Sequence, residues 1–502
     1  MKKVLLAVLV IFIATAVYAG DKVDPLSSTS QAVRDKTYKI FGTPQVQFDI
    51  SGEFSARGYY WDNAALKSDD TVTNSYYQGY IDLFPKLKVG NTTLITKIEM
   101  VDQSPWAKFD SSIGDTNKSE LFDASYDKYS TSKNDNLSLE RAYIHHDFNE
   151  NLFTEVGLMD GQWWGTTFSD NQAPKWRVKF QGKTAVGVVG ALVEKIAETG
   201  NSTVEDSEKD DYDAYALYGV TKVGDLTIEP LFFYHVDSAY YRPGLIPLGP
   251  TSAATTGIQS FTALDNGNNG VQVLYIALAS KGKIGPLGME AELGYISRDA
   301  KDIGTYITNT VTATGATSNT PTTYFDNDWK EYGAYLNLWN DMDFGRIGGK
   351  FAWGSYDEDG GLRLPNGAYT GAGFDFRQDF KSNLILGDEI PLGTGGVNED
   401  LTGMTLIQPY VKTVKLGIDK LTGSASFGYI ISNQKDNNYD GLTAWETDLG
   451  VQYKLSDNLL YKVDGGYAQI SVDKDKQSAT SLWAKDDPDP IMVLKHEILF
   501  TF

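Results

Sequence analysis

The sequence lacks cysteine altogether in its 502 residues. Disulfide bonds, thiol nucleophiles and thiolate metal ligands are therefore excluded. The same absence excludes the attachment of lipid to a cysteine behind a cleaved leader. It also excludes the Cys-x-x-Cys-His motif that would attach haem to this chain.

Long apolar runs and positive charge are scarce too. After the first 19 residues, no stretch approaches the about 18 consecutive apolar residues of a membrane-spanning helix, so a helical membrane protein is excluded. The chain has 44 Lys and Arg against 66 Asp and Glu, and its formal net charge is −22. This balance argues against nucleic-acid binding, which needs cations opposite the phosphates. It does not argue against a membrane barrel, which contacts lipid through neutral side chains.

Signatures of catalysis and metal binding are also missing. The sequence has no Gly-x-Ser-x-Gly, no His-Glu-x-x-His and no phosphate-binding glycine loop. His145 and His146, two of only four histidines, are adjacent, so on a strand they point to opposite faces. Acidic clusters at 357–360 and 436–441 offer oxygen ligands without the spacing of a calcium-binding EF-hand. We therefore expect no enzymatic activity, no metal site and no cofactor.

The first 19 residues read as a signal peptide. Met1-Lys2-Lys3 is a short basic start, Val4 to Val17 is apolar, and Val17-Tyr18-Ala19 is a small-residue cleavage site. The sequence thus predicts export through the Sec route and cleavage after Ala19. Residues 20–43 are polar, and they form either a periplasmic N-terminal segment or a small plug.

From Pro44 onward the chain alternates between apolar and polar residues with a period of two, which predicts strands. Every second connection is a tight turn of Gly, Asn and Asp, such as Gly90-Asn91 and Gly224-Asp225. The others include long polar connections, at 103–136, 197–211, 239–268, 300–328 and 358–403. Short turns on one side and long loops on the other are typical of outer-membrane barrels. Residues 44–502 are therefore predicted to form an all-β, transmembrane, antiparallel up-and-down barrel of about 18 strands, or 16.

The last strand, Pro490 to Phe502, supports this fold. Phe500 and Phe502 share one apolar face with Ile498, while Glu497 lies on the other face, and the chain stops at a bare Phe. The apolar face would be exposed to water unless lipid covered it. The segment resembles the terminal strand of bacterial outer-membrane β-barrels. The resemblance implies that Phe500 and Phe502 act as a membrane-assembly signal for the barrel-assembly machinery.

The alternation of apolar and polar residues also predicts which side chains face the barrel interior. Trp176, Val178 and Phe180 are expected to face lipid, which turns their polar neighbours inward. The interior would carry charges of both signs and orient polar solutes, or be merely solvated. The predicted pore-lining residues are Arg141, His145, Lys175, Arg177, Lys179, Glu229, Glu290, Glu292, Arg346, Lys350, Glu446, Asp448 and Asp464.

Two long connections, 103–136 and 358–403, are candidates to fold inward and narrow the barrel, or else they are surface loops. The residues proposed for a constriction are Phe109, Asp110, Asp115, Glu120, Arg363, Asp375 and Arg377.

The signal peptide, the recurring hairpins with alternating short and long connections, and the terminal Phe together resemble bacterial outer-membrane porins. This resemblance implies passive diffusion of small hydrophilic solutes and ions. The stretch Glu140-Arg141-Ala142-Tyr143, followed by 156–161 and Trp163-Trp164-Gly165, is also similar to alginate-export barrels. That family lines its pore with arginine, whereas this interior is mixed. The alternative from another class is a barrel that sheathes a partner such as a haem-carrying electron conduit.

The expected location is the bacterial outer membrane, with the chain as an integral component. The expected partners are outer-membrane lipid and lipopolysaccharide, the barrel-assembly machinery, and small polar solutes or ions. The barrel is either a monomer or a homotrimer, and no nucleic-acid partner is expected.

Overall fold

The structure is a computed structural model. It describes residues 38–42, 46–62, 74–100, 137–159, 164–168, 174–197, 212–237, 257–262, 271–299, 305–311, 317–322, 329–363, 369–373, 383–386, 403–434, 440–476, 487 and 489–502. The predicted signal peptide at 1–19 lies outside these residues. Among them, no helix is long and apolar enough to cross a membrane.

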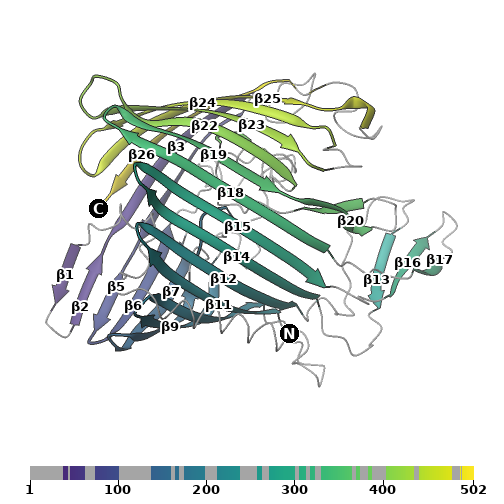
Figure 1. Cartoon of the computed structure of the whole chain (residues 1–502), viewed down its shortest axis with the longest axis horizontal. Coiled ribbons are helices and arrows are strands. Elements are labelled where there is room, and N and C mark those ends of the chain that lie inside the picture. Colours follow the sequence, from purple (N-terminus) through teal and green to yellow (C-terminus); the bar gives the residue numbers. More distant parts are fainter. Residues whose placement is uncertain are drawn as a thin grey trace, which may run out of the picture.

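Eighteen antiparallel strands form one closed wall (Figure 1). Each wall strand pairs with the next wall strand along the chain. The last, β26 (Ile491–Thr501), pairs with the first, β3 (Gly52–Asp62), from Met492 opposite Asp62 to Thr501 opposite Glu53. The predicted strand number and topology are therefore confirmed. The wall strands are β3 (Gly52–Asp62), β4 (Asn74–Leu83), β6 (Thr92–Met100), β7 (Leu137–Asn149), β8 (Leu152–Met159), β9 (Lys175–Thr184), β10 (Gly187–Ala197), β11 (Tyr212–Val223), β12 (Leu226–Asp237), β14 (Val271–Ile284), β15 (Leu287–Asp299), β18 (Trp329–Met342), β19 (Gly345–Gly354), β22 (Met404–Lys415), β23 (Leu421–Ser432), β24 (Thr443–Lys454), β25 (Leu459–Ser471) and β26 (Ile491–Thr501).

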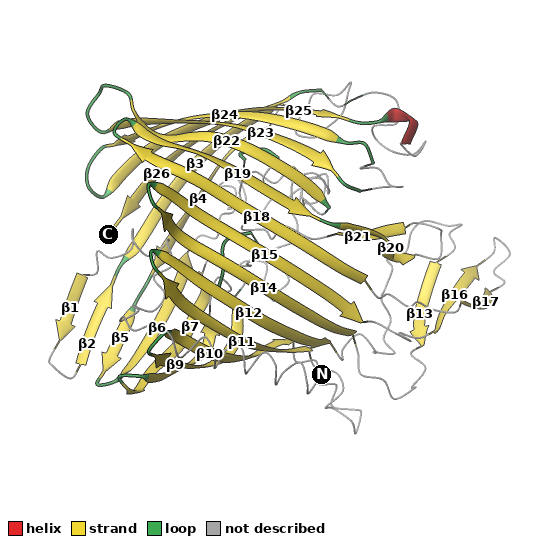
Figure 2. Ribbon diagram, viewed as in Figure 1, coloured by secondary structure: helices red, strands yellow, loops and turns green. Residues whose placement is uncertain are grey.

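Tight turns gather at one end of the barrel. Figure 2 shows turns of this kind at the left, at the same end as the C-terminus. Gly90, Gly224 and Gly285 have φ values of 58°, 62° and 60° there, a left-handed conformation that only glycine adopts at no steric cost. The predicted turns at Gly90 and Gly224 are thus confirmed. We call the half of the interior away from these turns the outer half.

Short strands extend the wall beyond the end of β26. The chain stops at Phe502, whose backbone exchanges hydrogen bonds with Gly52 of 2.8 and 3.0 Å. Beyond that point β2 (Val46–Ile50) pairs with β5 (Lys86–Val89) on one side and with β1 (Tyr38–Gly42) on the other. β1 therefore covers the edge of β2 opposite β5. It is the described part of the polar segment 20–43.

Three of the connections predicted to be long and polar contain short strands. β13 (Gly257–Thr262), β16 (Thr305–Val311) and β17 (Thr317–Thr322) form a three-stranded sheet, and β20 (Tyr356–Arg363) pairs with β21 (Tyr369–Gly373). A 3₁₀ turn, η5 (Lys474–Lys476), follows β25. These elements lie at the opposite end of the barrel from the C-terminus (Figure 2).

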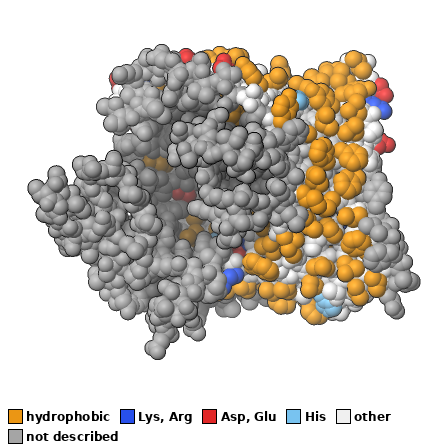
Figure 3. All heavy atoms as spheres, turned by 180° about the vertical axis from the view of Figure 1, so that it is seen from behind, with side chains coloured by type: hydrophobic (Ala, Val, Ile, Leu, Met, Phe, Trp, Pro, Cys, Tyr) orange, Lys and Arg blue, Asp and Glu red, His pale blue; other side chains and the backbone are white. Residues whose placement is uncertain are grey.

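The outer surface of the wall is apolar. Leu449, Leu293 and Trp176 are 63%, 59% and 60% exposed, although each occupies a regular strand position. Figure 3 shows such side chains as a broad band, with Lys, Arg, Asp and Glu atoms gathered near its right-hand edge. An apolar band with charged margins is what contact with lipid requires. On β9, Trp176 and Phe180 are exposed on the outer face, whereas Arg177 and Lys179 are buried.

Candidate functional site: the barrel interior

Two segments of the connections between wall strands lie buried within the fold. The first is 164–168, between β8 and β9, and the second is 383–386, between β21 and β22. Phe168, Ile385 and Leu386 are each 0% exposed. We call these segments the first and second inserts.

The first insert is held by two glutamates of the wall. The backbone N–H of Gly165 donates to Glu229 Oε2 at 2.9 Å. The backbone N–H and the hydroxyl of Thr166 donate to Glu292 Oε2 at 2.7 and 2.6 Å. Gly165 has a φ of 69°, and a side chain there would also meet Glu292 Oε2 at 3.0 Å. Glycine is therefore required where the insert turns against the wall.

Aromatic rings fix the two ends of the first insert. Phe168 stacks on Tyr335 of β18 with ring centroids 5.5 Å apart. Trp164 is buried in a cluster with Leu192, Tyr218 and Phe233, which come from β10, β11 and β12. The insert starts between β8 and β9 and ends against β18, so it crosses the interior instead of following its own strands.

The second insert is held by one glutamate of β24. The backbone N–H groups of Ile385 and Leu386 donate to Glu446 Oε1 and Oε2, both at 2.7 Å. Asn383 donates from its amide nitrogen to Asp448 Oδ2 at 3.3 Å. Charge-assisted bonds from two consecutive N–H groups to one carboxylate are strong, so Glu446 is the main anchor of this insert.

Both inserts join a single apolar cluster in the outer half. Phe168 and Leu384 to Leu386 pack with wall residues that include Trp61, Met404 and Ile470. These wall residues lie at the strand ends remote from the tight turns. The outer half is therefore narrowed by apolar packing around the two inserts.

The interior of β3 and β26 carries a hydrogen-bonded charge network. Glu497 accepts from Arg57 Nε and Ser55 Oγ, each at 2.8 Å, and lies 3.5 Å from Lys462 Nζ. Arg57 also donates to the hydroxyl of Tyr80 at 3.3 Å. Glu497 is 3% exposed, and a carboxylate buried this far is stable only because several donors satisfy it.

The cations of β9 are paired with acidic side chains. Arg177 Nε lies 2.6 Å from Glu194 Oε2, with both side chains almost fully buried. Glu155 lies 3.5 Å from Lys179 Nζ and 3.3 Å from His145 Nδ1. Cross-strand register places a carboxylate beside each of these cations, Glu194 opposite Arg177 and Glu155 opposite Lys179.

A second cluster of charged side chains, around Lys97, was not predicted from the sequence. Lys97 forms ion pairs with Asp82 at 3.2 Å, with Glu99 at 3.7 Å and with Glu140. The register between β6 and β7 shifts next to Lys97, so Glu140 and Arg141 both lie beside it. A bulge of this kind breaks the period of two. Alternation alone therefore assigns Arg141 inward and misses Glu140.

The other predicted interior residues have varied surroundings. Glu290 accepts from Asn337 at 3.3 Å, and Arg346 pairs with Asp341 at 2.7 Å. Lys281, which the prediction omitted, lies 3.9 Å from Glu229. Lys175 and Lys350 face the interior, and Asp464 lies opposite Lys495 in the register of β25 and β26.

The predicted constriction residues are not part of the described inserts. Phe109, Asp110, Asp115, Glu120, Asp375 and Arg377 lie outside the described residues, and Arg363 ends β20. The second insert does fall within 358–403, one of the two candidate connections. The first insert falls within the connection 161–175, which is not one of the two candidates for a constriction. Phe500 faces outward and stacks on Phe502 at 5.7 Å.

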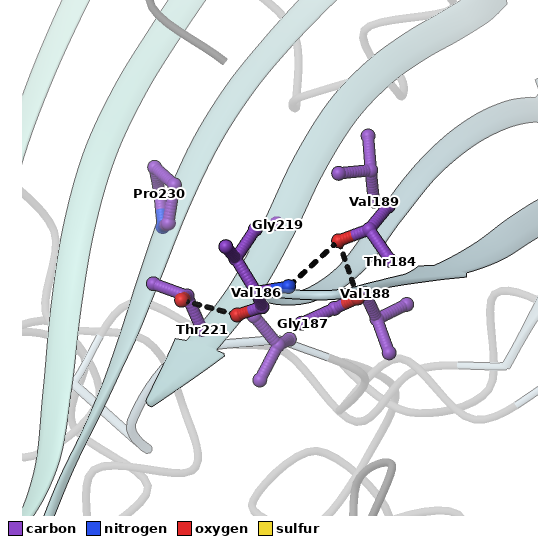
Figure 4. A pocket seen from close by; sticks show the side chains of 9 residues that line it. Thr184, Val186, Gly187, Val188, Val189, Gly219, Thr221 and Pro230 are labelled. Atoms are coloured by element: carbon purple, nitrogen blue, oxygen red, sulfur yellow. Dashed lines mark hydrogen bonds between the residues drawn. The ribbon is translucent and has the colours of Figure 1, made fainter. Parts of the chain in front are cut away.

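A small cavity beside the turn between β9 and β10 is no candidate for a solute site (Figure 4). Its volume is about 30 Å³, too small for a solute, and it lies between Val186, Gly187 and Thr221. Thr184 Oγ1 donates to the carbonyl of Gly187 at 2.9 Å and fixes this turn.

A closed antiparallel wall with an apolar exterior and a charged interior defines an integral membrane β-barrel, the architecture of bacterial outer-membrane barrels. Barrels of 16–18 strands of this class leave an aqueous channel, whereas about 8 strands leave none.

No family model and no curated protein matches this sequence. Among solved structures, OccAB3 of Acinetobacter baumannii is similar in fold with a TM-score of 0.48 and 8% identity, over 90% of this chain and 99% of that one. OccAB4 of the same organism has a TM-score of 0.46 and 10% identity, over 90% and 98%. OccK8 (OprE) of Pseudomonas aeruginosa has a TM-score of 0.44 and 9% identity, over 90% and 98%. These likenesses are distant, and the class of the protein follows from the wall itself.

Proposed function

We propose that this protein is a water-filled channel for passive diffusion of small hydrophilic solutes and ions across the outer membrane. The observation that carries the proposal is the buried charge inside the eighteen-stranded wall, opposite an apolar exterior. Charges such as Arg57 and Glu497 need water or ionic partners, whereas the exterior needs lipid.

The inserts set the size of the passage in this proposal. They occupy part of the outer half, so the solutes are small. Cations and carboxylates alternate around the interior, and many pair with one another, so ion selectivity is mild. A sheath for a folded partner would need an open interior, and the inserts Trp164 to Phe168 and Asn383 to Leu386 take up that room.

Export and assembly belong to the same proposal. Residues 1–19 direct the chain to the Sec route, and Phe500 and Phe502 present the assembly signal. The predicted pore-lining residues with partial exposure, among them Glu290, Arg346 and Asp464, contact the passing solute. The protein works as a monomer or a homotrimer.

The test is conductance in a planar bilayer. The purified full-length protein is expected to insert stepwise, each step adding an ohmic conductance. The reversal potential in a KCl gradient is expected to be small, because the interior charges are mixed. Liposomes containing the protein are expected to swell in small sugars and not in large ones. No conductance, together with haem that co-purifies, would instead support the sheath.

A further inference from the structure

Two carboxylates face each other beside the second insert with no donor between them. Glu446 and Asp448 are two residues apart on β24, so both point into the barrel. A Cβ on Gly466 would lie 3.0 Å from Asp448 Oδ1 and 3.3 Å from Glu446 Oε1, so the two carboxylates border the same point. Glu446 is 0% exposed, and Asp448 Oδ1 is buried without a hydrogen-bond partner. Two ionised carboxylates at this separation repel each other strongly unless a proton or a cation lies between them.

A third oxygen lies at the same place without a partner. Asn383 is 4% exposed, and its Oδ1 has no hydrogen-bond donor. Its amide nitrogen lies 3.3 Å from Asp448 Oδ2, a long hydrogen bond. The amide nitrogen therefore faces Asp448, and Oδ1 lies over Gly428, the residue opposite Glu446.

Two glycines leave room at this place. Gly428 lies opposite Glu446 on β23, and Gly466 lies opposite Asp448 on β25. A Cβ on Gly428 would come within 2.5 Å of the Asn383 amide, and one on Gly466 within 3.0 Å of Asp448 Oδ1. The absence of side chains at Gly428 and Gly466 therefore lets Asn383 and the two carboxylates lie directly against the wall.

We propose that Glu446, Asp448 and Asn383 bind a divalent cation of the calcium class, which fastens the second insert to the wall. One shared proton would satisfy the two carboxylates but leave the amide oxygen of Asn383 without a partner. A hard divalent cation coordinates all three oxygens and neutralises two negative charges, and water completes its coordination. Asp448 is partly exposed, so an ion can reach the site from the interior.

Other charges near the site have their own neighbours. Asp464 lies opposite Lys495 in the register of β25 and β26, and Lys462 lies 3.5 Å from Glu497. Ser426 donates to Asp448 Oδ2 at 3.0 Å and orients that carboxylate. The oxygen that remains for the ion is therefore Oδ1.

Calcium titration of the full-length barrel tests the site. Chelator-treated protein in detergent, titrated with CaCl₂ in a calorimeter, is expected to show one saturable event per chain. Asp448→Asn is expected to weaken that event at least about tenfold. Asp147→Asn removes an inward carboxylate elsewhere in the wall, and it is expected to leave calcium binding unchanged.

The melting temperature gives an independent measurement on the unaltered chain. Calcium that binds only the folded state should raise the melting temperature, and excess EGTA should reverse the rise. Absence of a saturable event in the wild type would overturn the proposal. Equal calcium binding by the wild type and Asp448→Asn would overturn it too, because the ion would then bind elsewhere. Either failure leaves the channel proposal intact, since conductance is measured separately.

Discussion

Glu446→Ala is expected to release the second insert from the wall and to raise the single-channel conductance. The substitution removes both acceptors of the Ile385 and Leu386 N–H groups, which are held at 2.7 Å in a fully buried place. Leaving each N–H without a partner costs about 1–3 kcal/mol, so the inserted conformation loses about 2–6 kcal/mol. A change of that size favours exit of the insert, and the outer half widens.

The measurement is conductance in planar bilayers containing EGTA, so that no divalent cation contributes. Glu290→Ala is the matched control, because Glu290 is an inward carboxylate that accepts from Asn337 and holds no insert. The control removes one partly exposed interior charge and releases no insert, so its conductance should change much less than that of Glu446→Ala. A folded Glu446→Ala barrel with wild-type conductance would show that the second insert does not limit the passage.

Leu449→Arg is expected to prevent stable insertion into lipid. Leu449 is 63% exposed on the outer face of β24, between the ends of the strand. A cation on the lipid face of a barrel costs about 2–4 kcal/mol near the bilayer midplane. This is a large fraction of the stability of a typical domain, about 5–15 kcal/mol. The folded fraction in liposomes under urea is expected to fall accordingly.

Gln452→Arg is the matched control for the lipid face. Gln452 lies three residues further along the same strand and faces the interior, where water solvates a cation. Its urea midpoint should stay close to that of the wild type. Equal destabilisation by the two substitutions would contradict the assignment of the two faces.

The wall could be predicted from the sequence because the signal is local. Period-two alternation assigns Trp176 outward and Arg177 inward without knowledge of any other strand. Tight turns at residues such as Gly224 mark where one strand ends and the next begins. The regular alternation of short turns and long loops then predicts the closed topology.

The inserts could not be predicted in the same way, because their partners are remote in sequence. Thr166 is 126 residues from Glu292, and Ile385 is 61 residues from Glu446. One local signal was available, since Leu384, Ile385 and Leu386 form an apolar run inside a polar connection. The segment Trp164-Gly165-Thr166 reads only as a turn.

The ion pairs could not be predicted from the sequence either, because they depend on the register between neighbouring strands. Arg177 and Glu194 become neighbours only when β9 and β10 align, and the sequence alone does not fix that alignment. The shift at Lys97 moves Glu140 inward against the alternation. Single-strand patterns therefore give the sign of each charge and its face, but not its partner.

The most direct test of the alternating wall is a cysteine scan of β25, since the natural chain contains no cysteine. Single cysteines are placed at positions 461 to 467 in turn, and the protein is reconstituted in liposomes. A water-soluble maleimide is expected to label positions 462, 464 and 466, and a lipid-soluble quencher is expected to reach a probe at 461, 463, 465 and 467. Equal labelling of both sets from water, with no period of two, would contradict a barrel wall between lipid and an aqueous interior.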